Sequence, residues 1–191
     1  LYDGRAWVGI VPFVMEGIRP SWLPSSFALD FLETNVRTYV HRDGAPGVYF
    51  FSLEASSWLA TMAARLQWSL PYFHATMQVN REGQRIRYET HRRSGDAASS
   101  VDFSVGVELG TSEPGTFEHF LLERYYLFVE HRGALYRGQV HHVPYPAWQV
   151  DIHHFDDGLI RAAGLPAVST RPEVAHFSPG VDVEVFGPWR V

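Results

Sequence analysis

The chain has 191 residues, a formal net charge of −5 at pH 7, 46% hydrophobic residues and 19% charged residues. This length and composition are typical of one compact globule, so we expect a single domain over residues 1–191. Its arginines are scattered, and only Arg92 and Arg93 adjoin. Together with the negative net charge, this argues against nucleic acid or an anionic membrane as a partner.

The chain contains no cysteine, which excludes disulfides and thiol nucleophiles and is compatible with the cytoplasmic location that we expect. No apolar run reaches the roughly 18 residues of a membrane-spanning helix. The first residue is Leu1 rather than methionine, so we expect that a preceding N-terminal segment is missing.

All sixteen basic residues are arginines, and none is a lysine. A lysine amine forms a Schiff base with a carbonyl substrate, whereas an arginine stays protonated and cannot replace it. Within these residues, Schiff-base chemistry on a side chain is therefore excluded.

Strand-like stretches separated by turn residues predict a mainly β protein. Asp43-Gly44 and Arg132-Gly133 offer the positive φ angles of tight turns, so several neighbouring strands are expected to form hairpins. In chain order, the predicted strands are 6–13, 31–41, 47–53, 73–80, 84–92, 101–109, 125–131, 134–142, 149–154 and 181–186.

Three segments predict short helices. The first, 58–66, follows the capping residue Ser57. The second begins at Thr116 and carries apolar residues at helical spacing to about Arg124. The third, 157–163, opens with acidic residues and ends at a glycine.

Alternation along 31–41 places two sets of side chains on opposite faces of a strand. One face is mostly β-branched and is typical of a packing surface. The other carries a carboxylate, an amide and a guanidinium between aromatic rings: Phe31, Glu33, Asn35, Arg37 and Tyr39. This second face is compatible with a solvated surface or with the wall of a pocket, and alternation alone does not distinguish them.

A second polar face follows Pro71, where Tyr72, His74 and Thr76 alternate with apolar residues. Because an unperturbed histidine has a pKa of about 6.5, His74 is a candidate general acid or base. The alternative is a histidine that only completes a structural hydrogen bond.

Four histidines form the adjacent pairs His141-His142 and His153-His154. Neighbouring strand residues point to opposite faces, so a metal site would need one histidine of each pair and a third ligand such as Asp151. The sequence also contains no dinucleotide-binding, phosphate-binding or serine-hydrolase motif. We therefore expect neither a metal nor a cofactor.

Separated strings along the chain resemble an uncharacterised bacterial family grouped with the acetoacetate decarboxylase-like fold. They are DGRAWVGIVPF at 3–13, ETNVRTYV at 33–40, GVYFFSL at 47–53, LPY at 70–72, and the string 117–126. The resemblance implies an α+β, mainly β architecture: a cone-shaped antiparallel β-barrel with two or three short helices that encloses a small-molecule cavity.

Acetoacetate decarboxylases use a lysine that follows a proline after a helix. In this chain the similar string ends in Tyr72, so the resemblance implies that a tyrosine occupies the place of the lysine. It also implies that Glu33 matches the strand glutamate of the decarboxylases. A Schiff-base decarboxylase is therefore not expected.

Two functions remain open. In the first, the chain acts on a small carboxylate or carbonyl compound by noncovalent acid–base chemistry: Glu33 is general acid or base, Arg37 holds a carboxylate or enolate oxygen, and Tyr72 and His74 donate protons. In the second, it is a non-catalytic ligand-binding or protein-interaction barrel. Ligand contacts are expected from Phe31, Asn35, Tyr39 and Thr76. The candidate partners are an unidentified small molecule and further copies of the chain.

Overall fold

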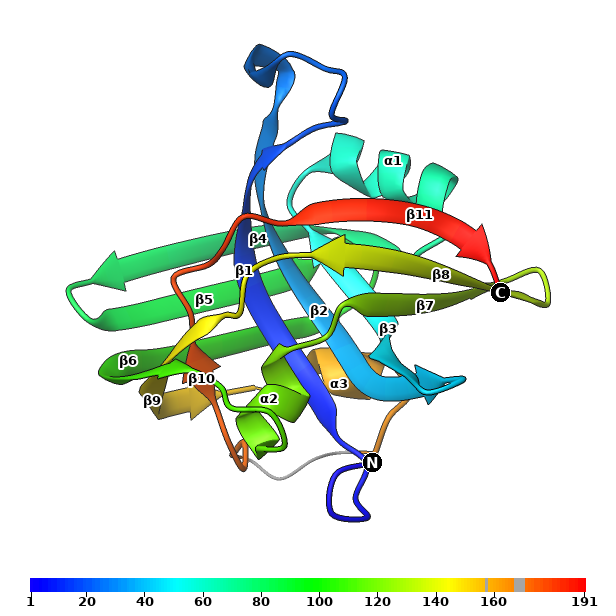
Figure 1. The fold of residues 1–191 in the computed structure, drawn as a ribbon. Helices are drawn as coiled ribbons and strands as arrows, with labels where there is room; N and C mark the ends of the chain where they lie inside the picture. The colour runs from blue at the N-terminus through cyan, green and yellow to red at the C-terminus, as the bar shows by residue number, and fades with distance from the viewer. Residues whose placement is uncertain (157, 167–170) are drawn as a thin grey trace.

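The computed structural model describes residues 1–156, 158–166 and 171–191. The described part is mostly β with few helices, as predicted (Figure 1). The strands are β1 (Val8–Ile18), β2 (Leu29–Arg42), β3 (Ala45–Ala55), β4 (Tyr72–Glu82), β5 (Arg85–Arg92), β6 (Ala98–Thr111), β7 (Tyr126–His131), β8 (Ala134–His141), β9 (Pro146–Phe155), β10 (His176–Phe177) and β11 (Glu184–Arg190). The helices are α1 (Trp58–Trp68), α2 (Phe117–Leu122), α3 (Gly158–Ala162) and the short 3-10 helix η1 (Ser25–Phe27).

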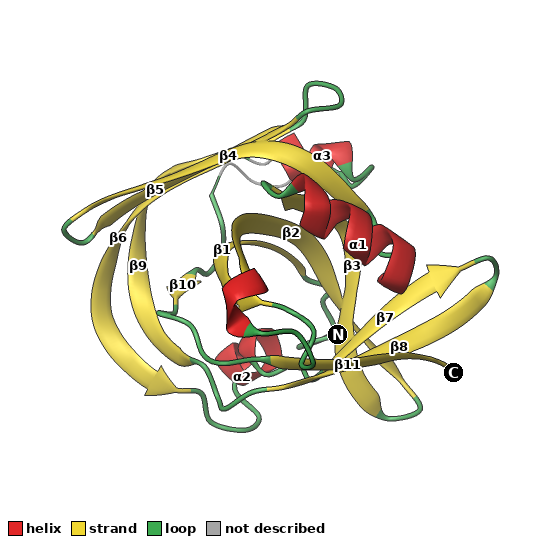
Figure 2. Ribbon diagram, turned by 90° about the horizontal axis from the view of Figure 1, so that it is seen from above, coloured by secondary structure: helices red, strands yellow, loops and turns green. Residues whose placement is uncertain are grey.

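The described strands do not form the predicted barrel. Their pairing follows an open path, β10-β9-β6-β5-β4-β3-β7-β8-β11, from which β2 and then β1 branch at β3. The sheet curves strongly, with β4, β5, β6 and β9 on one side, β7, β8 and β11 on the other, and β1 and β2 between them (Figure 2). The two end strands β10 and β11 are not paired with each other, so the sheet is not closed into a barrel.

β3 is the junction between the two sides of the sheet, and its pairings also correct the expectation of a purely antiparallel sheet. One edge of β3 pairs with β2 in antiparallel fashion. Its other edge pairs in parallel with β7 at Val48 and Tyr49, and with β4 at the end of the strand. β7 comes close because Gly47 has no side chain: a Cβ there would lie 2.6 Å from the carbonyl oxygen of Tyr126.

Local sequence signals account for most element boundaries. Asp43 and Gly44 both adopt positive φ in the β2–β3 turn, and Arg132 and Gly133 do so in the β7–β8 turn, which confirms these two hairpin turns. α1 begins where predicted, because the Ser57 side chain accepts a hydrogen bond from the backbone N–H of Ala60 at 3.2 Å.

The largest differences from prediction lie near the C-terminus. β11 spans Glu184–Arg190 rather than 181–186, and it passes Pro188 through a shift in register between Phe186 and Trp189. Such an irregularity accommodates a proline, which has no N–H to donate to the neighbouring strand. The two-residue β10 is too short to leave a periodic pattern. Residue 157, where the third helix was predicted to begin, lies outside the described residues.

β1 and β2 separate two apolar clusters. The larger one gathers β2, β3, β7 and α1, with Phe31, Leu53 and Tyr72 among its buried members. The smaller one lies on the other face of β2, where Val36 packs against Leu159 of α3. Both faces of β2 are thus buried, and its alternating side chains enter two different environments.

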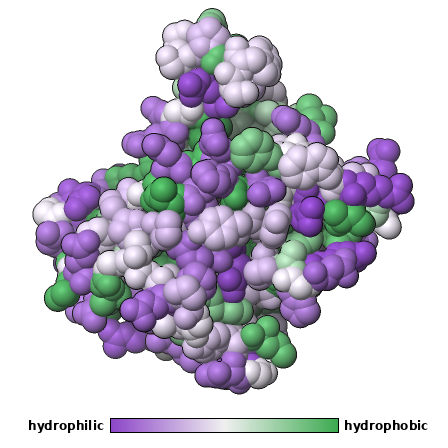
Figure 3. All heavy atoms as spheres, in the orientation of Figure 1, coloured by the Kyte–Doolittle hydropathy of each residue, from purple (hydrophilic) through white to green (hydrophobic). Residues whose placement is uncertain are grey.

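Exposed apolar residues do not gather into one patch on the face shown in Figure 3. The projecting β1–β2 hairpin carries two large ones, Trp22 and Phe27. Within the described ranges, no helix is both long enough and apolar enough to cross a membrane.

Candidate functional site

The polar face of β2 points into the protein rather than into solvent. Phe31, Glu33 and Asn35 are 7%, 2% and 4% exposed. Arg37 and Tyr39, further along the same face, are half-buried. The solvated alternative for this face is therefore wrong. A carboxyl, an amide and a guanidinium lie in succession on the side of β2 that faces the protein interior.

Glu33 and Tyr72 are in direct contact. The Tyr72 hydroxyl donates a hydrogen bond to Oε2 of Glu33 at 2.8 Å, and both residues are buried. Burial raises the pKa of Glu33 to about 8; the hydrogen bond from Tyr72 opposes this shift, and the nearby Glu54 carboxylate adds to it. Between about pH 4.5 and 8, where an ordinary glutamate is ionised, Glu33 is consequently mostly a neutral carboxylic acid.

The tyrosine of this pair stays in its neutral form. Burial raises the pKa of Tyr72 well above its usual value, and the neighbouring Glu33 carboxylate raises it further. Tyr72 is thus a fixed hydrogen-bond donor, whereas Glu33 is the member of the pair that changes protonation near neutral pH.

The end of α1 positions Tyr72. The helix stops at Ser69, which adopts the left-handed conformation, and Arg65 of its last turn donates from Nε to the carbonyl oxygen of Tyr72 at 2.6 Å. The backbone N–H of Leu53 donates to the carbonyl oxygen of Pro71 at 3.0 Å, which ties the start of β4 to β3. Because Tyr72 is then paired with Leu53, its ring lies on the same side of the sheet as Glu33.

Tyr88 of β5 contacts the backbone at Glu33. Its hydroxyl lies 2.9 Å from the carbonyl oxygen of Phe13 and 3.0 Å from that of Glu33. Since Phe13 and Glu33 are paired across β1 and β2, this hydroxyl holds both strands at the level of the acid. Alternation alone did not single out Tyr88, because its partners are backbone atoms of distant strands.

The Arg37 side chain is directed toward α2 rather than toward Glu33. It donates from Nη2 to the carbonyl oxygen of Leu121 in α2 at 3.1 Å, and its guanidinium carbon lies 5.6 Å from the ring centroid of Tyr39. The Cα atoms of Glu33 and Arg37 are separated by four residues of extended chain, roughly 13 Å. The two side chains therefore belong to different ends of the polar face.

The remaining predicted residues are not gathered at Glu33. Phe31 packs in the larger apolar cluster beside Tyr72. His74 is half-buried, and its carbonyl oxygen accepts from the backbone N–H of Arg93 at 3.0 Å. Thr76 is exposed on β4. Asn35 is buried, and its Oδ1 has no hydrogen-bond partner.

A second buried acid, Glu54, lies on the opposite face of the β2–β3 pair and was not predicted. Arg92 of β5 donates from Nε and Nη2 to its Oε1, and Ser52 donates to its Oε2 at 3.3 Å. The guanidinium carbon of Arg92 also lies 3.7 Å from the ring centroid of Phe73. Burial raises the pKa of Glu54, and Arg92 opposes that rise. Glu54 and Arg92 are buried and bonded to each other, which is typical of a structural ion pair.

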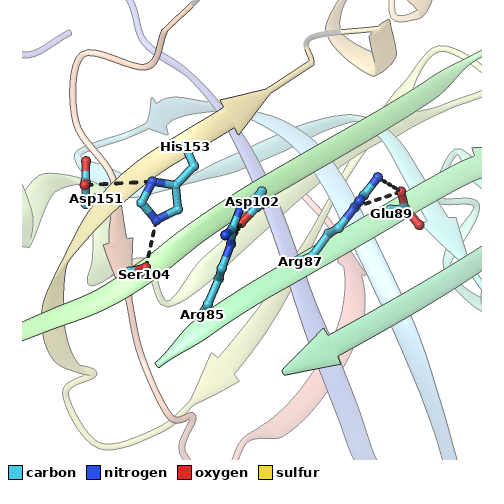
Figure 4. A network of polar contacts seen from close by, with 7 residues as sticks. All are labelled: Arg85, Arg87, Glu89, Asp102, Ser104, Asp151 and His153. Carbon is cyan, nitrogen blue, oxygen red and sulfur yellow. Dashed lines mark hydrogen bonds and ion pairs between the residues drawn. The ribbon is translucent and has the colours of Figure 1, made fainter. Parts of the chain in front are cut away.

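Exposed ion pairs cover another part of the sheet (Figure 4). Arg85 contacts Asp102 through two hydrogen bonds of 2.8 Å, and Arg87 contacts Glu89 at 2.7 Å. The network comprises Arg85, Arg87, Glu89, Asp102, Ser104, Asp151 and His153. Its members are partnered with one another at the surface, so it offers no site comparable to the buried one.

The paired histidines do not converge. His142 is buried between the rings of Tyr125 and Tyr145, each 4.6 Å away between centroids, whereas His153 lies in the exposed network. Among the residues that the structure describes, no group of three His, Cys, Asp or Glu side chains is arranged to hold a metal ion.

Two surface hollows of about 240 and 210 Å³ lie elsewhere. The larger is lined by residues such as His41 and Phe128, and the smaller by residues such as Trp68. Neither is lined by Glu33 or Tyr72, whose side chains are packed against their neighbours.

Comparison with known proteins places the chain in a family. The sequence profile of the DUF2071 family, described as an uncharacterized conserved protein, matches residues 1–182. The uncharacterized protein YqjF of Bacillus subtilis is 34% identical over 191 residues, which are 99% of this chain and 78% of YqjF.

Solved structures with a similar fold include two enzymes. An acetoacetate decarboxylase from Legionella pneumophila has a TM-score of 0.55 at 17% identity, over 85% of this chain and 67% of that one. The enduracididine biosynthesis enzyme MppR, with HEPES bound, has a TM-score of 0.57 at 13% identity, over 87% of this chain and 66% of that one. MppR with pyruvate gives 0.50 at 14% identity, over 85% and 65%.

The chain spans about two thirds of the length of these structures. At such low identity the likeness shows the fold alone. By its match to the family profile and its identity to YqjF, the chain belongs to the DUF2071 family of uncharacterized conserved proteins, and it has an acetoacetate decarboxylase-like fold.

Proposed function

We propose that this chain binds a small carbonyl or carboxylate compound and transfers a proton on it by noncovalent acid–base chemistry at Glu33 and Tyr72. The observation that supports the proposal is the buried Glu33–Tyr72 hydrogen bond, with the pKa of Glu33 raised to about 8. A general acid or base is most effective when its pKa lies near the working pH. An ordinary surface glutamate lacks this property.

The two side chains have complementary roles. The ionised fraction of Glu33 removes a proton from the carbon next to the ligand carbonyl, and the Tyr72 hydroxyl turns from Glu33 to donate its hydrogen bond to the enolate oxygen that forms. The proton on Glu33 is replaced by one from solvent, and return of that proton to carbon completes an exchange without any net reaction. No amine takes part, in agreement with a chain that has no lysine.

Burial sets a condition on this chemistry. Glu33 is 2% exposed and Tyr72 is 9% exposed, so a ligand reaches them only when covering side chains move aside. The same burial favours a second function, a binding protein in which the pair only fixes the sheet. The two functions differ in whether a bound ligand exchanges its protons.

Proton exchange with solvent is the test. Pyruvate, which the similarly folded MppR binds, and the longer 4-oxopentanoate are incubated in D₂O, and loss of their α-proton signals is followed by proton NMR. We expect exchange above the buffer rate that rises with pH through about 8, and a loss of roughly 100-fold in Glu33→Gln.

Glu130→Gln is the control, because Glu130 is exposed on β7, and it should exchange both compounds at the wild-type rate. Exchange at the same rate in Glu33→Gln would contradict the proposed role of Glu33. A ligand that raises the melting temperature without any exchange would establish the binding protein instead.

A further inference from the structure

Two arginines at the far end of the polar face have no acidic partner. Arg37 of β2 donates to the carbonyl oxygen of Leu121, and Arg124, just after α2, donates to that of Glu123 at 2.8 Å. The Nε atoms of both are buried without a hydrogen-bond partner. Within the described part of the chain, neither guanidinium is in an ion pair with a carboxylate.

Both guanidinium groups lie near the ring of Tyr39. Their carbons lie 5.6 and 5.7 Å from the ring centroid of the same residue, Tyr39, and that of Arg124 lies 4.5 Å from the ring of Phe120. Burial lowers the pKa of Arg124 and the charge of Arg37 lowers it further, whereas Tyr39 and the Glu123 carboxylate oppose this shift. Like charges kept together in partly buried surroundings destabilise a fold, so such an arrangement is typical of a functional site.

A neutral acceptor lies next to the arginines. Asn35 is two residues before Arg37, on the same face of β2, and is 4% exposed. Its Oδ1 has no hydrogen-bond partner. A buried polar atom without a partner is costly, and it is satisfied when a ligand supplies a donor.

The local charge favours a singly charged anion. Glu123 is 3% exposed, and its two oxygens accept from the Tyr125 hydroxyl at 2.6 Å and from the backbone N–H of Tyr145 at 3.0 Å. This carboxylate leaves one uncompensated positive charge from the two guanidinium groups. A monocarboxylate neutralises that charge, whereas a phosphate dianion exceeds it.

We propose that Arg37 and Arg124 bind the carboxylate of the ligand whose carbonyl is acted on at Glu33 and Tyr72, and that Asn35 accepts a hydrogen bond from a hydroxyl or N–H group that the natural ligand carries between the two. This inference rests on the proposed function and names its substrate class. Because the Cα atoms of Glu33 and Arg37 are four residues apart on an extended strand, roughly 13 Å, the carboxylate and the reacting carbonyl belong to different parts of an elongated oxo acid. Guanidinium groups suit this role, since their N–H groups match both oxygens of a carboxylate.

Binding of 4-oxopentanoate and its neutral methyl ester, measured by titration calorimetry, tests the arginine pair. We expect the wild type to bind the acid more tightly than the ester, and Arg124→Gln to weaken binding of the acid roughly 10- to 100-fold while leaving the ester unchanged. The melting temperature of Arg124→Gln should stay the same or rise, because a like-charge contact is removed. Arg42→Gln, which alters an exposed arginine at the end of β2, the strand that carries Arg37, should behave as wild type.

Three outcomes would overturn the arginine site: equal binding of acid and ester by the wild type, unchanged binding of the acid by Arg124→Gln, or tighter binding of inorganic phosphate than of acetate. A lower melting temperature with loss of both ligands would assign Arg124 a structural role and overturn it as well. Glu33→Gln separates this proposal from the previous one, because it should keep the preference for the acid over the ester, which the arginines determine, while its proton exchange is roughly 100-fold slower.

Discussion

Arg92→Met is expected to destabilise the fold by about 3–5 kcal/mol, because it leaves the fully buried Glu54 carboxylate without its cation. The Arg92 side chain is 9% exposed and that of Glu54 is 0% exposed, so water cannot replace the lost partner. Urea unfolding at pH 7 measures the change in the free energy of unfolding.

The same strand provides a matched control. Arg87 also pairs with a glutamate, Glu89, but its side chain is 58% exposed, and Arg87→Met should change the free energy of unfolding by less than about 1 kcal/mol. The double variant Glu54→Gln/Arg92→Met should recover part of the loss, because no buried charge remains. If Arg92→Met were as mild as Arg87→Met, the buried pair would not stabilise the fold.

Glu33→Gln is expected to make the protein more stable than the wild type at pH 8 and about equally stable near pH 4.5. Folding raises the pKa of Glu33 from its ordinary value of 4.5 to about 8, so the folded state favours the protonated acid. The stabilisation from this group is complete below pH 4.5 and is lost as the pH rises through 8. Its contribution falls by roughly 1.4 kcal/mol per pH unit between the two values.

Urea unfolding at pH 5, 6.5 and 8 measures this slope. Glu54, whose pKa is also raised, contributes in the same direction in both proteins, so the difference in slope reports the titration of Glu33 together with its interaction with Glu54. Glu130→Gln serves as the exposed control and should keep the wild-type slope. Identical slopes in Glu33→Gln and the wild type would mean that Glu33 is ionised in the folded protein at neutral pH.

The fold was predictable where local chemistry determines it. The Ser57 cap and the Asp43-Gly44 turn form as expected, because each depends on residues within a few positions. Closure of a barrel depends on pairing between strands far apart in sequence. β3 pairs with β2 along one edge and with β4 and β7 along the other, and nothing in its own residues indicates this branching.

The candidate site was predictable only in part. Alternation identified Glu33, Asn35 and Arg37 as one face, but it could not show that this face is buried, since solvated strands alternate too. Arg124 follows a helix 87 positions after Arg37, and only tertiary packing against Tyr39 brings them together. The resemblance to the decarboxylases indicated Glu33 and Tyr72 separately, and their 2.8 Å contact joins them.

The protonation of Glu33 can be followed at the residue itself by carbon NMR of its carboxyl group. The protein is labelled with ¹³C in the glutamate side-chain carboxyl carbon, and the Glu33 signal is assigned by its absence in Glu33→Gln. We expect this signal to titrate with a midpoint of about 8. A midpoint near the ordinary value of 4.5 would contradict this expectation.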